Sequence, residues 1–212
     1  MGENKSYFET RFCFDAQREL VWKQIVKYLQ RYIPLYAKVL DIGAGYHNFI
    51  NNIIAREKHA LDISDISKDN VNKDVNFYLD SAYEMKSIKS SYFDFVFASN
   101  LLEHLSCEEL KAALFQVKRV LKNKGRFIIL QPNFRYCYKV YFDDYSHKQV
   151  FTHLSLPNLL EENGFRVIKV LPRFIPFSMK SQLPKVSFLV WLYLRIPFKP
   201  FGGQMLILAE KQ

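Results

Sequence analysis

The stretch VLDIGAG at residues 39–45 decides the fold. Its aliphatic residues flank a single acid, Asp41, and have the composition of a strand buried inside a parallel sheet. Gly43 and Gly45 follow, and then apolar side chains recur at helical spacing: Phe49, Ile50, Ile53 and Ile54. The two glycines therefore lie at a predicted strand-to-helix turn, where they permit positive φ and let a ligand approach the backbone. The free N–H groups at the start of the helix favour an anion.

Such a turn can serve either a dinucleotide or S-adenosylmethionine. A dinucleotide turn carries a third glycine three residues after the second, and Asn48 occupies that position. It has no need of an acid two residues before the first glycine, where Asp41 stands. An acid at that point can accept from the ammonium of a methionine moiety, while the helix start takes its carboxylate. The pattern favours a methyl donor.

Size and composition predict one globular domain spanning residues 1–212. A hydrophobic content of 49% and an aromatic content of 16% exclude a disordered chain. The net charge of +9 and the pI near 9.3 make a polyanion or an anionic membrane surface a candidate partner. From Phe165 onwards there are eight basic residues against Glu210 alone, so seven of the nine net charges lie there.

Cysteine usage and the chain start predict a cytoplasmic protein. Cys13, Cys107 and Cys137 are widely spaced and form no disulfide or metal pattern, and we expect no metal site in the protein. The polar residues 1–6 lead into no apolar core, which excludes a signal peptide there. The apolar run at 186–196 is far shorter than the ~20 residues needed to span a bilayer.

Helices and strands alternate along the chain. Residues 1–35 hold an aromatic and basic lead-in (Tyr7, Phe8, Arg11 and Phe12) and a helix from Phe14 to about Tyr32. The lead-in either packs at the sheet edge or folds over the cofactor. Further strands are expected at 59–63, 75–82, 92–98, 127–130, 165–170 and 205–209. Helices are expected from a capping box at Ser106 to Gly125 and from a Ser155 cap to Gly164. This alternation predicts a doubly wound α/β fold with a parallel sheet.

Acids at two strand ends are candidates for cofactor binding. Asp62 lies about 20 residues after Asp41, where a βαβ unit places a carboxylate against ribose hydroxyls. Asp80 follows the next strand and is a candidate for an adenine amino group. The alternative for Asp62 is a surface acid, and for Asp80 a plain loop acid.

Two histidines are candidates for a general base, because an imidazole titrates near neutrality. His104 follows the fourth strand, and His147 lies in the polar segment after the fifth. Asp143 or Asp144 could orient His147. The structural alternatives are that His104 caps the neighbouring helix and that His147 is a satisfied loop residue.

Together these motifs resemble the class I S-adenosylmethionine-dependent methyltransferases, in particular the type-11 group. The resemblance covers about residues 36–171 and the closing strand. It is carried by LDIGAG at 40–45, Asp62, DSA at 80–82, residues 93–105 with LEHL, and LKNKG at 121–125. It implies a Rossmann-like, mostly parallel, seven-stranded sheet whose last strand is antiparallel and inserted between the fifth and sixth. Residues 142–147 and 173–177 look like a subgroup associated with bacterial surface-glycan genes.

The resemblance also implies roles for single residues. Asp41, Gly43 and Gly45 would hold the methionine end, Asp62 the ribose, Asp80 with Ser81 the adenine, and Asn100 with Leu101 the far side of the cofactor. The expected S-adenosyl-L-methionine set is Asp41, Gly43, Ala44, Gly45, Asp62, Ile63, Asp80, Ser81, Ala82, Asn100 and Leu101, and the expected catalytic set is His104, Asp144 and His147. The family often has a third glycine where His47 stands, so this side chain must point away from the cofactor or cover it.

The expected activity is O-methylation of a small-molecule, glycan or lipid-linked acceptor. The charge suggests RNA methylation as an alternative, and a third hypothesis is a non-catalytic cofactor-fold protein docked at a membrane. The apolar and basic insertion at 171–202, between the last two strands, predicts peripheral contact with an anionic inner membrane surface. Burial against the sheet, or a dimer contact, is the alternative for this insertion.

Overall fold

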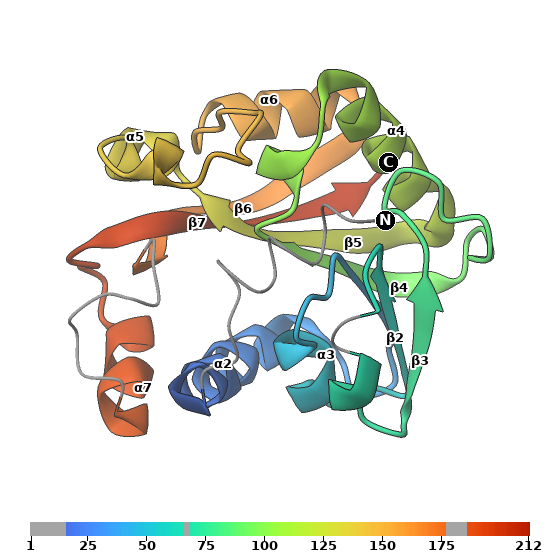
Figure 1. The fold of residues 1–212 in the computed structure, drawn as a ribbon, viewed down its shortest axis with the longest axis horizontal. Coiled ribbons are helices and arrows are strands. Elements are labelled where there is room, and N and C mark those ends of the chain that lie inside the picture. Colours follow the sequence, from blue (N-terminus) through green and yellow to red (C-terminus); the bar gives the residue numbers. More distant parts are fainter. Residues whose placement is uncertain (1–15, 66–67, 177–185) are drawn as a thin grey trace.

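A computed structural model describes residues 16–65, 68–176 and 186–212 (Figure 1). The predicted lead-in, Cys13, and Phe177, Lys180 and Lys185 of the insertion lie outside these ranges. The strands are β1 (Lys38–Ile42), β2 (Glu57–Asp62), β3 (Val75–Leu79), β4 (Phe93–Ser99), β5 (Leu121–Pro132), β6 (Phe165–Pro176) and β7 (Gly202–Lys211). The α-helices are α2 (Ala16–Leu29), α3 (Asn48–Asn52), α4 (Cys107–Val120), α5 (Phe134–Cys137), α6 (Ser155–Glu162) and α7 (Ser187–Arg195). Single 3-10 turns are η1 (Gln30–Tyr32), η2 (Lys68–Asn70), η3 (Leu102–His104) and η4 (Tyr141–Asp143).

The strands form one seven-stranded sheet in the order β3-β2-β1-β4-β5-β7-β6. Its first five strands pair in parallel, whereas β7 runs antiparallel to both β5 and β6. The expected topology is therefore confirmed, including the insertion of the last strand between the fifth and sixth. The order reverses direction at β1 and β4, which is the point where open α/β sheets bind their ligands.

Helices cover both faces of the sheet, with α4, α5 and α6 on one face and α2, α3 and α7 on the other (Figure 1). Each face carries its own apolar core. On the first face α4 buries a stripe formed by Leu110, Leu114 and Val117. On the second, α2 buries Ile25 and Leu29 against β1 and β4.

Several predicted boundaries were wrong for local reasons. The helix after the glycine turn ends at Asn52, because Ile53 is extended; Ile54 lies beyond it and is 63% exposed. The predicted capping box between Ser106 and Glu109 is confirmed, but α4 ends at Val120 rather than at Gly125. The backbone turns extended at Leu121, and Gly125 lies inside β5.

The last third of the chain also differs from the expected boundaries. Residues 171–176 continue β6, so the insertion begins later than predicted and β7 starts at Gly202. Ser155 is the first residue of α6 rather than its cap; the Thr152 hydroxyl oxygen accepts from the Ser155 amide instead. Gly164 follows the helix with φ +80°, as a helix-ending glycine does.

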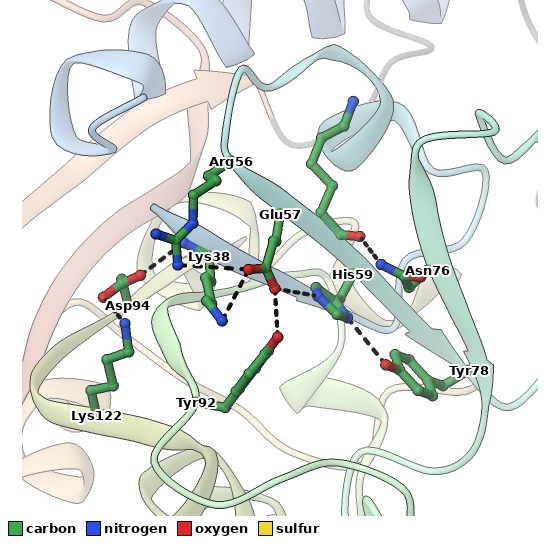
Figure 2. Close-up of polar contacts among 10 residues, drawn as sticks. Lys38, Arg56, Glu57, His59, Asn76, Tyr78, Tyr92, Asp94 and Lys122 are labelled. Carbon is green, nitrogen blue, oxygen red and sulfur yellow. Dashed lines mark hydrogen bonds and ion pairs between the residues drawn. The ribbon is translucent and has the colours of Figure 1, made fainter. Parts of the chain in front are cut away.

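A polar network lies at the amino ends of the parallel strands, opposite the ligand-binding edge (Figure 2). Glu57, the first residue of β2, accepts from the Tyr92 hydroxyl at 2.5 Å and pairs with Lys38 Nζ at 2.9 Å. The oxygen that accepts from Tyr92, Oε2, also lies 3.7 Å from Nε2 of His59, whose ring stacks on Tyr78, whereas Lys38 pairs with Oε1. These contacts join the amino ends of neighbouring strands. The candidate ligand-binding residues lie at the opposite, carboxyl ends of the strands.

Candidate active site

The glycine turn after β1 has the predicted conformation. Gly43 and Gly45 have φ of +65° and +51°, in the left-handed region that favours glycine. The amides of Gly43 and Ala44 donate to the carbonyl of Leu61, at 2.8 and 3.2 Å, which closes the turn onto the end of β2. A Cβ at Gly43 would lie 2.9 Å from Cδ1 of Leu101. The backbone of this turn is therefore in close contact with the segment after β4.

Asp41 and Asp62 are both buried beside this turn, with 3% and 5% exposure. Asp62 accepts from the Gly45 amide at 2.8 Å with Oδ2 and from the Ser64 amide at 2.9 Å with Oδ1. Asp41 accepts from the Ile50 amide in the first turn of α3. Burial raises the pKa of both carboxyls, and the nearby Asp62 charge raises that of Asp41 further. A cationic ligand group at this point would offset that cost.

His47, which stands where a third glycine was expected, keeps a glycine-like backbone. It has φ +59° and ψ +20° directly before α3, and its side chain is fully buried. The ring packs edge-to-face on Phe77 of β3 at 5.5 Å between centroids. The imidazole is thus buried against β3, which agrees with the first of the two expected orientations.

Asp80, the acid after β3, accepts hydrogen bonds from backbone amides of the loop that follows it. Asp80 accepts from the Ser81 amide at 2.7 Å and from the Lys86 amide at 2.7 Å. The Ser81 side chain is buried and its Oγ has no hydrogen-bond partner in the described part of the chain, whereas the Ala82 methyl packs into the core. Ile63 is 55% exposed at the end of β2 and provides an apolar surface at the same edge.

The segment after β4 begins with a left-handed residue. Asn100 has φ +49°, and its amide donates to the carbonyl of Leu130 in β5. A non-glycine residue in this region costs of order 1–3 kcal/mol, and such residues cluster at functional sites. Here the turn places Leu101 over Gly43 and the Asn100 side chain at the carboxyl edge of the sheet.

Buried polar atoms that have no hydrogen-bond partner within residues 16–65, 68–176 and 186–212 follow this edge from strand to strand. They are Oγ of Ser81 after β3, Oδ1 of Asn100 after β4, both amide atoms of Gln131 in β5, and Oδ1 of Asn133 after β5. A buried polar atom left unpaired costs about 1–3 kcal/mol, so a row of them indicates atoms that a ligand would satisfy. Ser81 and Asn100 were in the expected cofactor set, so the residues fit a bound S-adenosylmethionine. Gln131 and Asn133 were not predicted; their position at the end of the fifth strand was the available signal.

His104 and His147 come together, although they are 43 positions apart in the chain. His104 ends η3 and His147 follows η4, and their ring centroids lie 4.9 Å apart. The Glu103 carbonyl accepts from the amides of Lys148 and Gln149 at 2.7 and 3.0 Å, which holds the two segments together. The alternative that His104 caps the next helix is wrong, because Ser106 is that cap.

Asp144 is linked to His104 by way of Ser146. The Ser146 hydroxyl donates to Oδ1 of Asp144 at 2.5 Å and lies 3.0 Å from Nδ1 of His104. His147 Nδ1 lies 2.7 Å from the carbonyl oxygen of Tyr141. Burial lowers the pKa of His104 to about 4 and that of His147 below its usual range, so both imidazoles are neutral at pH 7. The sequence predicted that Asp143 or Asp144 orients His147; in the structure Asp144 is linked through Ser146 to His104, and the Tyr141 carbonyl positions the His147 ring.

Glu103 is the cluster residue whose role the sequence did not predict. Its side chain is fully buried, and burial raises its pKa to about 8. The signal was its place in LEHL directly after the fourth strand, where only the histidine was given a role.

Comparison with known proteins agrees with this geometry. The family model described as a methyltransferase domain matches residues 14–170. The chain belongs to the methyltransferase-domain family. A search of curated proteins finds no match. With the fold and the glycine turn, family membership makes the protein a class I S-adenosylmethionine-dependent methyltransferase.

Solved structures share this fold at low sequence identity. An Archaeoglobus fulgidus S-adenosylmethionine-dependent methyltransferase is 24% identical with a TM-score of 0.69, and the match covers 100% of both chains. The 1,6-didemethyltoxoflavin-N1-methyltransferase of Burkholderia thailandensis, solved with its substrate and S-adenosylhomocysteine, is 17% identical (TM-score 0.64; 99% and 85% covered). A Haloferax volcanii chain, from a complex with the Trm112 methyltransferase activator, is 12% identical (TM-score 0.68; 92% and 90% covered).

Proposed function

We propose that this methyltransferase methylates a hydroxyl oxygen of a small-molecule, glycan or lipid-linked acceptor. The observation that supports an oxygen acceptor is the cluster of Glu103, His104, Asp144 and His147. The first residues of this cluster directly follow Asn100 and Leu101 at the end of β4. In the sheet, β4 lies next to β1 on the side opposite to β2. A hydroxyl has to lose its proton during transfer, and this cluster contains groups that can promote that loss.

The transfer itself is a displacement at the methyl carbon. Bound S-adenosylmethionine would supply an electrophilic methyl group: the acceptor oxygen would form the new O–C bond as the C–S bond breaks, and the sulfonium would leave as the neutral thioether of S-adenosylhomocysteine. The hydroxyl proton goes to the cluster and then to solvent. The cofactor supplies the driving force, so the chain's own residues mainly position the two reactants and promote deprotonation.

The cofactor roles proposed for single residues follow from their contacts. Gly43, Ala44 and Gly45 present backbone to the methionine end. Asp62 would bind the ribose with the lone pairs that its two amide contacts leave available. Ser81 Oγ and Asn100 Oδ1 are the unpaired atoms that adenine and the far side of the cofactor would satisfy.

A lipid-linked acceptor is supported by a basic pocket at the flank of the sheet. The pocket, of about 520 Å³, lies between the end of α2, the second half of β6 and the segment after α7. Its lining includes Arg31, Arg173, Arg195 and Lys199, and none of the described residues that line it is acidic. Burial and the neighbouring Arg31 lower the pKa of Lys199 to about 8, as expected where cations lack a counter-ion. A phosphate-bearing acceptor would supply that counter-charge.

Methyl transfer from labelled S-adenosylmethionine to a panel of glycan, lipid-phosphate, small hydroxyl and RNA acceptors tests the proposal. We expect label in an ether that resists mild acid. His147→Ala should lower turnover by about 10²–10⁴-fold and leave the cofactor dissociation constant nearly unchanged. The matched control is His153→Ala, which removes a histidine bonded to Asn133 outside the cluster. Label on nitrogen, or in RNA alone, would overturn the oxygen acceptor.

A further inference from the structure

Three side chains of the cluster converge on one point. Glu103 and His104 project from η3 and His147 from the loop after η4. A carboxylate oxygen of Glu103 and a ring nitrogen of each histidine all lie within 4.8 Å of one another. Two imidazole nitrogens and one carboxylate oxygen are the ligand set of many catalytic zinc and non-haem iron sites.

The carboxylate of Glu103 is the first argument that a ligand belongs there. It is fully buried, and neither of its oxygens has a hydrogen-bond partner among the residues that the structure describes. Leaving a carboxylate in this condition is costly unless a cation or a proton donor approaches it. The loop at 148–149 is bonded to the Glu103 backbone, so the chain holds the residue firmly in this environment.

The hydrogen bonds of the two histidines are the second argument. A carbonyl oxygen can only accept, so Nδ1 of His147 carries the proton that it donates to Tyr141. The Ser146 hydroxyl gives its proton to Asp144, so its oxygen accepts from Nδ1 of His104. In both rings the lone pair therefore lies on Nε2. Metal-binding histidines show this pattern, in which the second ring nitrogen donates to a carbonyl or to a hydrogen-bonded group.

We propose that Glu103, His104 and His147 bind a divalent transition-metal ion. Metal–ligand bonds of roughly 2.0–2.2 Å bring ligand atoms closer together than 4.8 Å, so binding contracts the cluster slightly. Nitrogen-rich ligands favour ions of the zinc, cobalt or iron(II) type over magnesium or calcium. Three protein ligands leave open coordination positions. The role of the ion rests on the proposed function: it would polarise the acceptor oxygen and ease loss of its proton, leaving the imidazoles as ligands rather than as the base.

Metal binding can be measured on the untagged, chelator-stripped full chain without any acceptor. Co²⁺ titration followed by visible absorption, and Zn²⁺ competition against a chromophoric chelator, report site geometry and affinity. We expect one ion per chain. Glu103→Gln and His147→Ala should each weaken Zn²⁺ binding by more than the about 10–100-fold expected for Ser146→Ala, which removes no ligand but a hydroxyl that bonds His104 and Asp144. Glu103→Gln keeps the size of the side chain, so it serves if His147→Ala fails to fold.

The control His153→Ala should bind like the wild type. Absence of saturable binding by the wild type, or equal affinity in Glu103→Gln and His153→Ala, would overturn the inference and leave Glu103 as a buried neutral acid.

The metal site and the proposed function can each be contradicted without the other. A one-to-one metal complex without methylation of any hydroxyl acceptor contradicts only the proposed function. Full O-methylation by a chelator-stripped protein that binds no metal contradicts only the metal site.

Discussion

The amide of Gly45 donates a hydrogen bond of 2.8 Å to Oδ2 of Asp62, which joins the turn after β1 to the acid at the end of β2. The other oxygen of Asp62 accepts from the Ser64 amide at 2.9 Å. The carboxylate proposed to bind the ribose therefore also holds the turn proposed to bind the methionine end. A substitution of Asp62 should therefore change both the affinity for the cofactor and the stability of the turn.

Asp62→Ala should lower both the melting temperature without ligand and the affinity for S-adenosylmethionine. The substitution leaves two amides without their charged acceptor, each worth about 1–3 kcal/mol, so we expect a loss of affinity of at least about tenfold. Thermal melts and calorimetric titration measure the two effects. Asp65→Ala, at an exposed acid in the same loop, is the control and should change neither. A variant that melts and binds like the wild type would remove Asp62 from the site.

Gly43→Ala should destabilise the turn for two separable reasons. The left-handed backbone costs an alanine about 1–2 kcal/mol, and the new methyl meets Leu101 at 2.9 Å. The double variant with Leu101→Ala removes the second cost and keeps the first. Urea unfolding of the four proteins in the cycle should therefore show a favourable coupling between the two substitutions. Simple additivity would mean that Leu101 moves aside without cost.

The parallel, doubly wound sheet and the glycine turn could be predicted because both depend on local patterns and on known chain-crossing rules, whereas the antiparallel last strand was implied by the family resemblance. Asp41, Asp62, Ser81 and Asn100 lie at strand ends, and parallel strands bring such ends to one edge. The pairing of His104 with His147 could not be predicted, because it depends on how the loop at 141–149 folds back onto η3. Glu103 was missed for a related reason: its burial under that loop is a tertiary property.

Helix ends were the least predictable local feature. Gly125 has the residue type of a helix stop, yet α4 ends at Val120, because Leu121 has to pair with Phe93 of β4. Strand pairing thus prevailed over the glycine signal. Among the described residues no helix is long and apolar enough to cross a bilayer, which agrees with the short length of the apolar run at 186–196.

The Glu57 network should make stability sensitive to acid (Figure 2). Tyr92 and Lys38 lower the pKa of Glu57 from 4.5 to about 2, so this carboxylate is harder to protonate in the folded state. Its contribution is fully present above pH 4.5 and is lost as the pH falls towards 2. Glu57→Gln should therefore be less stable than the wild type at pH 7, and the difference should shrink in this acid window. A constant difference from pH 7 to pH 2 would show that lost packing, and not charge, is responsible.

The final prediction concerns α7, which we propose as a peripheral contact with an anionic membrane. Leu194 is buried on the core face shared with α2, and Phe188, Leu189 and Leu192 are exposed. Phe188 stacks on Trp191, and the Arg195 guanidinium lies 4.1 Å above that indole. Helix α7 is therefore neither fully buried in the core nor covered by polar side chains on its exposed side. An exposed apolar row beside basic side chains fits the interface of anionic lipids.

Phe188→Glu should abolish sedimentation with phosphatidylserine or phosphatidylglycerol vesicles without lowering the melting temperature, because 65% of this side chain is already exposed. The matched control is Phe115→Glu on α4, where a phenylalanine of 66% exposure lies on the opposite face of the sheet. Wild-type binding should weaken with salt, since the basic residues around α7 act through charge. Trp191→Glu should lose binding too. If the wild type ignores anionic vesicles and Phe188→Glu instead changes the sedimentation coefficient of the protein alone, the face is a contact between copies of the chain.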